Sequence, residues 1–398
     1  MKIYRITAAF LLIVLSIATF SGCTTFDNFK TAFIDKPEEN TATILIGVYE
    51  PMTGVDSESS RAEIEGIELA HEMYPTVNGK FVQLEYADNA SDIYAAETAI
   101  KELILKEPAV ILGSYVSVYS MVAGEYINEA QIPAIAITNT NPLVTSNNDY
   151  YFRVCYVDSN QGDILARYVL ESKKETTAGV LLPEGDDAAM AMATAFTDRI
   201  KAETENEDAI TVYEEYTPGD KDFSAQLEAV EKAGVKSVLL PGDNIDSINI
   251  IKQASDMGLD VVFLGDKDWS SDEFQDLADG VATDANTAFV NFYAADEAVN
   301  EEAEKFLKAY HEKYGENSVP EDAVALGYDS YIIALDAIDR ADDDATGEEI
   351  RDVLKEERSF QGASGTITFN TTGDPIKTAY ISTWRDGELV SIYTVDPV

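Results

Sequence analysis

The chain has 398 residues, more than one compact core usually holds, so two domains are expected. Its 73 aspartates and glutamates against 28 lysines and arginines give a net charge of −45 at pH 7. A surface of this charge repels phosphate backbones, which argues against nucleic-acid binding.

The first residues form a targeting segment. MKIYR is a short basic region, and ITAAFLLIVLSIATF is the apolar stretch behind it. The stretch ends in Phe20-Ser21-Gly22-Cys23, which resembles a bacterial lipobox, although Phe20 departs from the usual aliphatic residue. We therefore predict a lipoprotein signal peptide at residues 1–22 and a lipidated Cys23, which would anchor the protein to the membrane from outside the cytoplasm. A transmembrane anchor or a plain secretory signal is the alternative.

Residues 23–41 are predicted to be the lipidated cysteine and a tether, because they lack clear periodicity and contain several polar residues and a proline. If Cys23 carries lipid, Cys155 is the only remaining cysteine, and no disulfide can form within the chain. Cys155 is then expected to be a small buried residue of the core.

From Thr43 onward, apolar strands alternate with amphipathic helices in two blocks. In the first block we expect strands at 43–49, 80–86, 109–114 and 134–138, and helices at 61–74, 91–106 and 117–130. In the second block we expect strands at 178–183, 210–216, 236–241 and 260–265, and helices at 160–173, 187–203, 222–233, 245–257 and 271–279. This alternation predicts an α/β protein with parallel sheets that helices cover on both faces.

The tail of the chain has a different pattern. It is predicted to contain a strand at 288–293, helices at 297–315, 322–341 and 347–356, and closing strands at 366–370, 378–384 and 389–395. Two simple α/β blocks leave this tail unexplained.

Ligands of open α/β sheets bind outside the carboxyl ends of the strands, and this rule locates the candidate site. In the first block, Ser117 lies near a helix start, where free backbone N–H groups suit a carboxylate, and the hydroxyls of Ser117 and Thr140 can add donors. The alternative is that Ser117 only caps the helix and that Thr138 and Thr140 only close a turn.

The second block places Asp266 and Asp268 of GDKDW at a strand end. Carboxylates there suit an ammonium group, although in so acidic a protein they can equally form a solvated loop. A carboxylate site in one block and an ammonium site in the other together describe an amino acid.

The chain resembles the type I periplasmic solute-binding proteins, in the branch of branched-chain amino-acid receptors of ABC transporters. The resemblance covers about residues 43–395 and rests on segments such as IGVYEPMTG, NTNPLVT, YYFRVCYVDSNQGD, FLGDKDW and GTITFNTTGDP. It implies two Rossmann-like lobes joined by a three-crossover hinge near 156–161, 285–295 and 361–365, which accounts for the tail. The N-terminal lobe would comprise residues 42–157 plus 290–361, and the C-terminal lobe 158–289 plus 362–398.

The resemblance also implies ligand contacts. Ser117 and Thr140 match positions that hold the α-carboxylate, and Thr138 matches a residue whose carbonyl meets the α-ammonium. Asp266 matches the acid that pairs with the ammonium. GDKDW has one residue more than the usual G-D-G-W, so Asp268 is a rival.

The part of the pocket that would hold the ligand's side chain departs from the family. Ser59, Ala188 and Asp243 stand at positions that often carry aromatic rings in relatives. Smaller residues widen the pocket, and an unpaired buried carboxylate at Asp243 would be costly. We therefore expect a solute that is larger or more polar than leucine, with a cationic or hydroxylated side chain facing Asp243.

The predicted function is that of a substrate-binding lipoprotein that captures an amino-acid-like solute and delivers it to an ABC permease and ATPase complex. A ligand-sensing subunit of a membrane receptor is the alternative, and a purely structural lipoprotein is a third possibility. Enzymatic activity is not expected, because the only histidines, His71 and His311, lie in predicted helices and no metal-ligand spacing or G-x-S-x-G motif is present. No cofactor or metal is expected.

Overall fold

The computed structural model describes residues 43–296, 298–342, 344–356 and 358–397. The predicted signal peptide, Cys23 and the tether lie outside the described residues. Ile44–Asn78 and Val82–Val398 form one compact unit, and the pocket discussed below lies within it. No helix in the described part of the chain is long and apolar enough to cross a membrane.

A six-stranded sheet has the order β2-β3-β1-β4-β5-β6. Its strands are β1 (Thr43–Glu50), β2 (Thr76–Val77), β3 (Lys80–Asp88), β4 (Val110–Leu112), β5 (Ala134–Ala136) and β6 (Tyr151–Arg153). Strands β1, β4, β5 and β6 pair in parallel, so their carboxyl ends meet at one edge.

A seven-stranded sheet has the order β16-β15-β11-β10-β9-β7-β8. Its strands are β7 (Ala178–Pro183), β8 (Ile210–Tyr216), β9 (Ser237–Leu239), β10 (Val262–Gly265), β11 (Thr287–Asn291), β15 (Ala379–Arg385) and β16 (Glu388–Val395). The first five are parallel, whereas β15 and β16 add in antiparallel fashion. The predicted α/β class is confirmed, with mostly parallel rather than wholly parallel sheets.

A small antiparallel sheet contains β12 (Ser359–Gly362), β13 (Gly365–Phe369) and β14 (Pro375–Lys377). The three closing strands predicted for the tail are therefore present as β13, β15 and β16, but β13 lies in the small sheet. The chain enters the seven-stranded sheet again only at β15. The lobe boundaries stay a prediction.

The helices follow the predicted order closely. They are α2 (Arg61–Met73), α3 (Ile93–Ile104), α4 (Ser117–Ala130), α5 (Asp158–Arg167), α6 (Asp187–Thr204), α7 (Ser224–Ala233), α8 (Asn244–Met257), α9 (Asp272–Ala278), α10 (Glu301–Tyr314), α11 (Asp322–Arg340) and α12 (Gly347–Leu354). Short 3-10 turns η1 (Pro142–Val144) and η3 (Lys267–Ser270) follow two strand ends. The helix predicted at 160–173 changes to a π-helix, η2, over Tyr168–Lys173.

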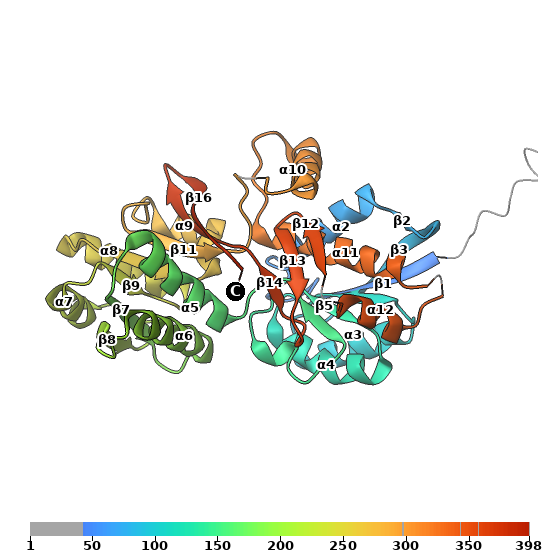
Figure 1. The fold of residues 1–398 in the computed structure, drawn as a ribbon, viewed down its shortest axis with the longest axis horizontal. Coiled ribbons are helices and arrows are strands. Elements are labelled where there is room, and N and C mark those ends of the chain that lie inside the picture. The colour runs from blue at the N-terminus through green and yellow to red at the C-terminus, as the bar shows by residue number, and fades with distance from the viewer. Residues whose placement is uncertain (1–42, 297, 343, 357, 398) are drawn as a thin grey trace, which may run out of the picture. The chain divides into compact units, whose positions relative to one another are not determined.

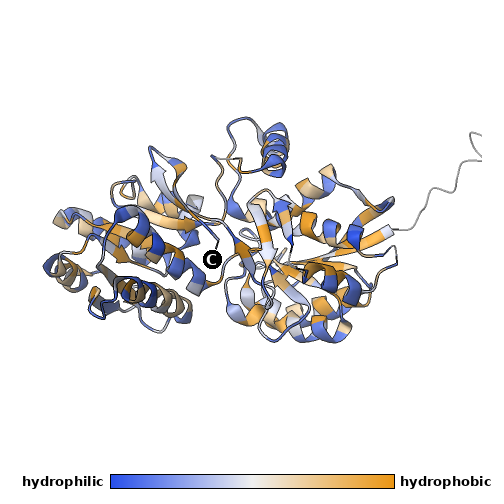
Figure 2. Cartoon of the chain, in the orientation of Figure 1, coloured by the Kyte–Doolittle hydropathy of each residue, from blue (hydrophilic) through white to orange (hydrophobic). Residues whose placement is uncertain are grey.

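Three hydrophobic clusters fill the layers between sheets and helices (Figure 1). One packs the six-stranded sheet against α3 and α4, and another packs the seven-stranded sheet against α7, α8 and α9. The largest cluster contains the opposite faces of both sheets with α2, α11, α5 and α6. Figure 2 shows the hydrophobic colour on inner strands of the two large sheets and a mixture of both colours on the surrounding helices.

Close helix contacts at glycine bring pocket residues together. A Cβ on Gly66 of α2 would lie 2.0 Å from the Val324 carbonyl oxygen of α11, and one on Gly327 would lie 2.2 Å from the Glu63 oxygen. Only glycine permits this approach. The contact places Glu63 of α2 against Gly327 of α11.

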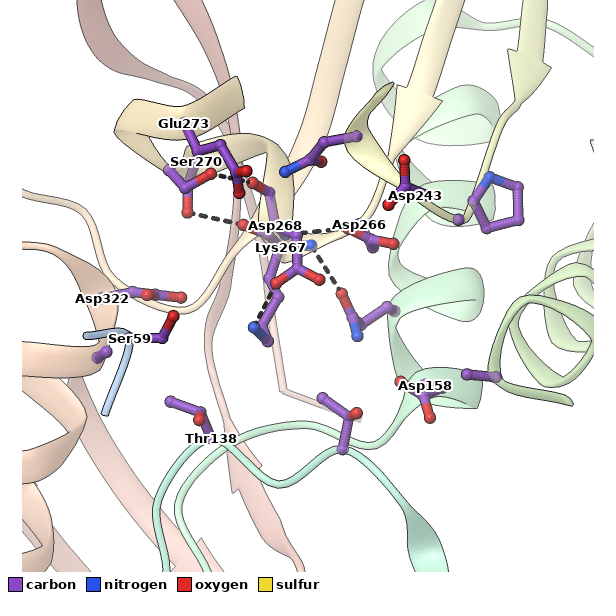
Figure 3. Close-up of a pocket in the computed structure, with 18 of the residues that line it drawn as sticks. Ser59, Thr138, Asp158, Asp243, Asp266, Lys267, Asp268, Ser270, Glu273 and Asp322 are labelled. Atoms are coloured by element: carbon purple, nitrogen blue, oxygen red, sulfur yellow. Dashed lines mark hydrogen bonds and ion pairs between the residues drawn. The ribbon is translucent and has the colours of Figure 1, made fainter. Parts of the chain in front are cut away.

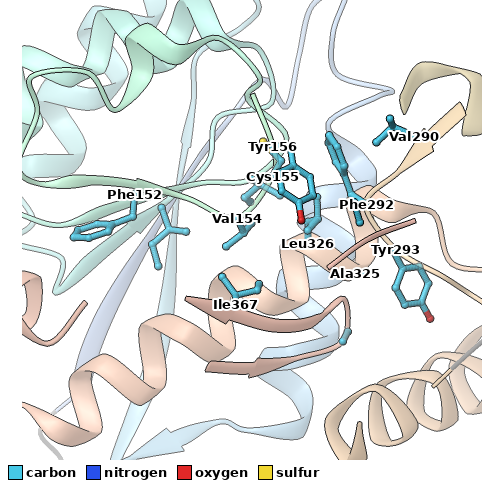
Figure 4. Close-up of a cluster of buried hydrophobic side chains, with 14 of the residues drawn as sticks. Phe152, Val154, Cys155, Tyr156, Val290, Phe292, Tyr293, Ala325, Leu326 and Ile367 are labelled. Carbon is cyan, nitrogen blue, oxygen red and sulfur yellow. The ribbon is translucent and has the colours of Figure 1, made fainter. Parts of the chain in front are cut away.

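The segments that connect the two large sheets share one buried cluster (Figure 4). Tyr156 after β6 packs against Phe292 after β11, with ring centroids 5.8 Å apart, and Phe152 of β6 packs against Phe369 of β13 at 5.2 Å. Cys155 is fully buried and donates its Sγ–H to the Asn139 carbonyl at 3.1 Å, as expected for a core cysteine.

Candidate functional site

A pocket of about 870 Å³ lies at the carboxyl ends of β1, β4 and β5 and of β7, β9 and β10 (Figure 3). Residues from the start of α11 complete its wall. The volume is in the range of small-molecule sites. The position agrees with the rule that parallel sheets bind ligands beyond their carboxyl ends.

The pocket wall is strongly acidic. Nine of the lining residues are carboxylates: Glu58, Asp158, Asp186, Asp243, Asp266, Asp268, Glu273, Glu321 and Asp322. Among the described lining residues, Lys267 is the only basic one. The wall therefore suits a cationic group far better than an anionic one.

Seven of the eight ligand contacts predicted from the sequence line this pocket, namely Ser59, Thr138, Thr140, Ala188, Asp243, Asp266 and Asp268. Ser117 is absent from the described lining residues. It is the first residue of α4, and its Oγ accepts a hydrogen bond from the Asn141 N–H at 3.4 Å. Ser117 therefore lies behind the loop that carries Thr140.

Thr138 contacts a buried pair of carboxyl groups that sequence reasoning did not find. Its hydroxyl donates to Glu63, and the Glu50 carboxylate accepts from the Tyr115 N–H at 2.7 Å. Glu50 and Glu63 are both fully buried and hydrogen-bond to each other. Burial raises the pKa of Glu63 to about 7, and burial together with the Glu63 charge raises the pKa of Glu50 well above its usual range. The pair therefore retains a shared proton at neutral pH.

Thr140 lies beside an acid. The Asp158 N–H donates to the Thr140 carbonyl at 3.2 Å, and both residues line the pocket. Burial raises the pKa of Asp158. The neighbouring asparagines shape the loop: Asn141 accepts from the Leu143 N–H at 2.9 Å, and buried Asn139 donates to the Tyr115 carbonyl at 2.9 Å.

The loop after β10 carries Asp266, Lys267 and Asp268. Asp266 caps η3, since its carboxylate accepts from the Asp268 N–H at 2.9 Å. Burial and the Asp268 charge raise the pKa of Asp266 to about 7. The Lys267 N–H donates to the side chain of buried Gln161 at 3.0 Å, which fixes the loop against α5.

The Lys267 side chain enters the pocket and is 17% exposed. Its Nζ lies 2.5 Å from Asp268 Oδ1. Burial by itself lowers the pKa of Lys267, but Asp268, Tyr115 and Asp322 outweigh burial and hold this pKa well above its usual value. Asp322 is half-buried, and one of its oxygens is buried without a hydrogen-bond partner.

Asp243 differs from its expected environment. It lines the pocket, but it is exposed, and its Oδ1 accepts from the Ile245 N–H at 2.8 Å as the N-cap of α8. The expected cost of an unpaired buried carboxylate therefore does not arise at this position. Asp186 caps α6 in the same way by accepting from the Ala189 N–H at 2.9 Å.

The described residues include no group of three or more His, Cys, Asp or Glu side chains placed to hold a metal ion. His71 lies on α2 and contacts the Tyr331 hydroxyl at 2.9 Å, and His311 lies on α10. Neither is among the described residues that line the pocket.

The family is decided by comparison with known proteins. Residues 43–388 match the family model described as periplasmic binding protein. The chain belongs to the periplasmic binding protein family. This membership makes it a solute-binding protein that works outside the cytoplasm, a solute receptor rather than an enzyme.

Solved structures similar to this receptor include a leucine binding protein of Thermotoga maritima. That protein is 29% identical, with 89% of this chain and 99% of that chain covered and a TM-score of 0.75. A branched-chain amino acid binding protein of Streptococcus pneumoniae in complex with isoleucine is 26% identical, with 89% and 100% covered and a TM-score of 0.74. A Leu/Ile/Val-binding protein homolog of Brucella melitensis is 26% identical over 359 residues, with 88% of this chain and 94% of that protein covered.

Proposed function

We propose that this receptor captures an amino acid or amino-acid-like solute that carries a cationic group in addition to its carboxylate. The observation that carries the proposal is the excess of nine carboxylates over one lysine in the pocket wall. A wholly apolar side chain would add no positive charge to offset the negative charge of these acids after the pocket closes over it. A cationic side chain supplies that charge.

The geometry of the wall supports this polarity. Ser59 and Ala188 are exposed and small, so they leave room in the pocket for a long side chain. We assign the cationic group of the solute to the part of the wall formed by Asp243 and Asp266. Thr138 and Thr140 lie at the opposite part of the wall, after β5, and this is where we place the carboxylate.

The relatives support an amino-acid-like solute. Leucine and isoleucine are named for two of the similar solved structures. We therefore propose that the ligand of this chain has an amino-acid backbone and differs from leucine and isoleucine in its side chain. The nine acids of the pocket wall are the reason for that change.

Capture and delivery would follow from the two predicted lobes, 42–157 plus 290–361 and 158–289 plus 362–398. We propose that they close on the solute by a hinge and that the closed form docks on the permease and ATPase complex.

Lipid on Cys23 would keep the receptor at the membrane. Loss of membrane association in a Cys23→Ser variant is the result that checks the anchor.

A thermal-shift screen over amino acids, short peptides and small amides tests the proposed solute class. A ligand at 100 times its dissociation constant raises the free energy of unfolding by about 2.7 kcal/mol. We expect the largest rise in melting temperature with amino acids whose side chains are cationic. No shift with any solute of the panel would contradict the binding function, and a larger shift with leucine than with any basic amino acid would contradict the proposed class.

A further inference from the structure

Lys267 holds a fixed position in an acidic pocket. Its backbone N–H is bound to Gln161, and its Nζ is 2.5 Å from Asp268 Oδ1. The side chain is only 17% exposed and points from the loop after β10 toward the part of the wall where Thr138 lies (Figure 3). An ammonium group of the protein therefore already occupies this part of the pocket.

Asp266 and Asp268, the two acids predicted to bind a solute's α-ammonium, both contact other groups of the protein. Asp268 pairs with Lys267, and Asp266 accepts from the Asp268 N–H at 2.9 Å. An α-ammonium placed against Asp268 would lie beside the like charge of Lys267, and that arrangement is unfavourable in a pocket of reduced dielectric.

The part of the wall assigned to the solute's carboxylate, at Thr138 and Thr140, has a negative charge nearby. The Asp158 N–H donates to the Thr140 carbonyl and brings Asp158 beside Thr140, so a solute carboxylate that approaches Thr140 meets another negative charge. The charge of Lys267 acts on Asp158 and on Glu63, the partner of Thr138. Among the described lining residues, Lys267 alone supplies a positive charge to offset Asp158.

We propose that Lys267 takes the place of a solute's α-ammonium as the partner of Asp268 and binds the solute's carboxylate. The inference rests on the proposed function and refines its solute class. The preferred solute has a carboxylate at one end and a cationic group at the other, and an α-ammonium beside the carboxylate is dispensable.

Three probes of similar chain length separate these groups. Lysine has both ammonium groups and the carboxylate, 6-aminohexanoate lacks the α-ammonium, and cadaverine lacks the carboxylate. Calorimetric titration of the unmodified protein should show 6-aminohexanoate binding about as tightly as lysine. Cadaverine should bind about tenfold to a hundredfold more weakly, since it forfeits a charge-assisted contact.

Variants at Lys267 complete the test. Lys267→Met should bring the lysine-to-cadaverine affinity ratio close to one, and Lys267→Arg should restore the preference for lysine. Lys252→Met is the matched control, because Lys252 lies on α8 and donates to the Leu277 carbonyl outside the pocket. That variant should keep the unmodified ratio.

The inference is overturned if cadaverine binds the unmodified protein as tightly as lysine, or if Lys267→Met leaves the ratio unchanged. The titrations of unmodified protein decide the matter even if Lys267→Met fails to fold. Tight binding of lysine with a strong need for its α-ammonium would overturn the inference and leave the proposed function standing. Binding of leucine alone would overturn the proposed function, and the inference with it.

Discussion

The Glu50–Glu63 pair shows how single residues prepare the pocket wall. Two fully buried carboxyl groups cannot both be ionised without a large desolvation cost, so the pair holds a proton. Through that pair, Thr138 and the backbone of Tyr115 are fixed on the six-stranded sheet's side of the pocket. Replacing Glu63 by glutamine keeps a hydrogen-bond acceptor for Thr138 and removes the ionisable group. It therefore separates the effect of the hydrogen bonds on stability from the effect of the proton.

Glu63→Gln should flatten the pH dependence of stability. The folded-state pKa of Glu63, about 7, lies above its ordinary value, so the folded protein binds more protons than the unfolded chain below pH 7. The free energy of unfolding should therefore fall as pH rises toward and through 7. Urea unfolding between pH 5 and pH 8 should show a slope shallower by up to about 1.4 kcal/mol per pH unit in the variant.

The control for this experiment is Glu125→Gln on an exposed face of α4. Asp266, whose pKa is also raised to about 7, titrates in the same pH window in all three proteins and cancels in the comparison. Equal slopes for the unmodified protein and Glu63→Gln would show that Glu63 is ionised throughout.

Much of the site's position, but not its charge balance, was predictable at the residue scale. Seven predicted residues lie on the pocket wall because the strand ends were recognisable in the sequence. Lys267 lies within GDKDW at a strand end. A lone cation at such a place indicates a site for an anionic group, and the sequence-based prediction did not use it. Glu63 and Asp322 could not be foreseen, because the contact between α2 and α11 joins residues about 260 positions apart.

At the scale of elements, segments with a clear period or a continuous apolar run were predicted, and four short strands were missed. The helix at 117–130 and the strands at 178–183 and 210–216 have the predicted bounds, because each is long enough to show its period. Strands β2, β6, β12 and β14 have two to four residues, too few for a period. Tertiary pairing alone defines them.

A buried polar network ties the small sheet to α11. Asp329 accepts from the Ser364 N–H at 3.0 Å, Lys377 donates to Ser364, and Lys377 also donates to the Phe292 carbonyl at 3.4 Å. Asp329 and Lys377 are buried, and burial raises the pKa of Asp329 to about 6 and lowers that of Lys377 to about 8. The network thus connects the segments after β11, before β13 and at the end of β14.

Lys377→Met should be destabilising, because it removes the donor to Ser364 and to the Phe292 carbonyl together with the buried positive charge that acts on Asp329. A buried polar group left without its hydrogen bond costs about 1–3 kcal/mol, and more where a charge is involved. Lys355→Met is the control, since its exposed ion pair with Asp149 should contribute less than about 1 kcal/mol. Similar losses in the two variants, measured by urea unfolding at pH 7, would contradict a structural role for the network.

At the scale of the whole molecule, charge and pocket agree. The net charge of −45 attracts cations toward the protein, and the nine carboxylates of the pocket continue that field inward. The fold is that of a solute receptor, and the family supplies the general function. The acidic wall of the pocket is the reason for proposing that the side chain of the solute is cationic.

Calorimetric titration with lysine, norleucine and leucine tests the central claim most directly. Lysine and norleucine differ mainly in the terminal ammonium group, so their affinity difference measures what the acidic wall contributes to binding. We expect lysine to bind more tightly than norleucine and leucine. Tighter binding of norleucine or leucine would contradict the claim that this receptor selects a cationic solute.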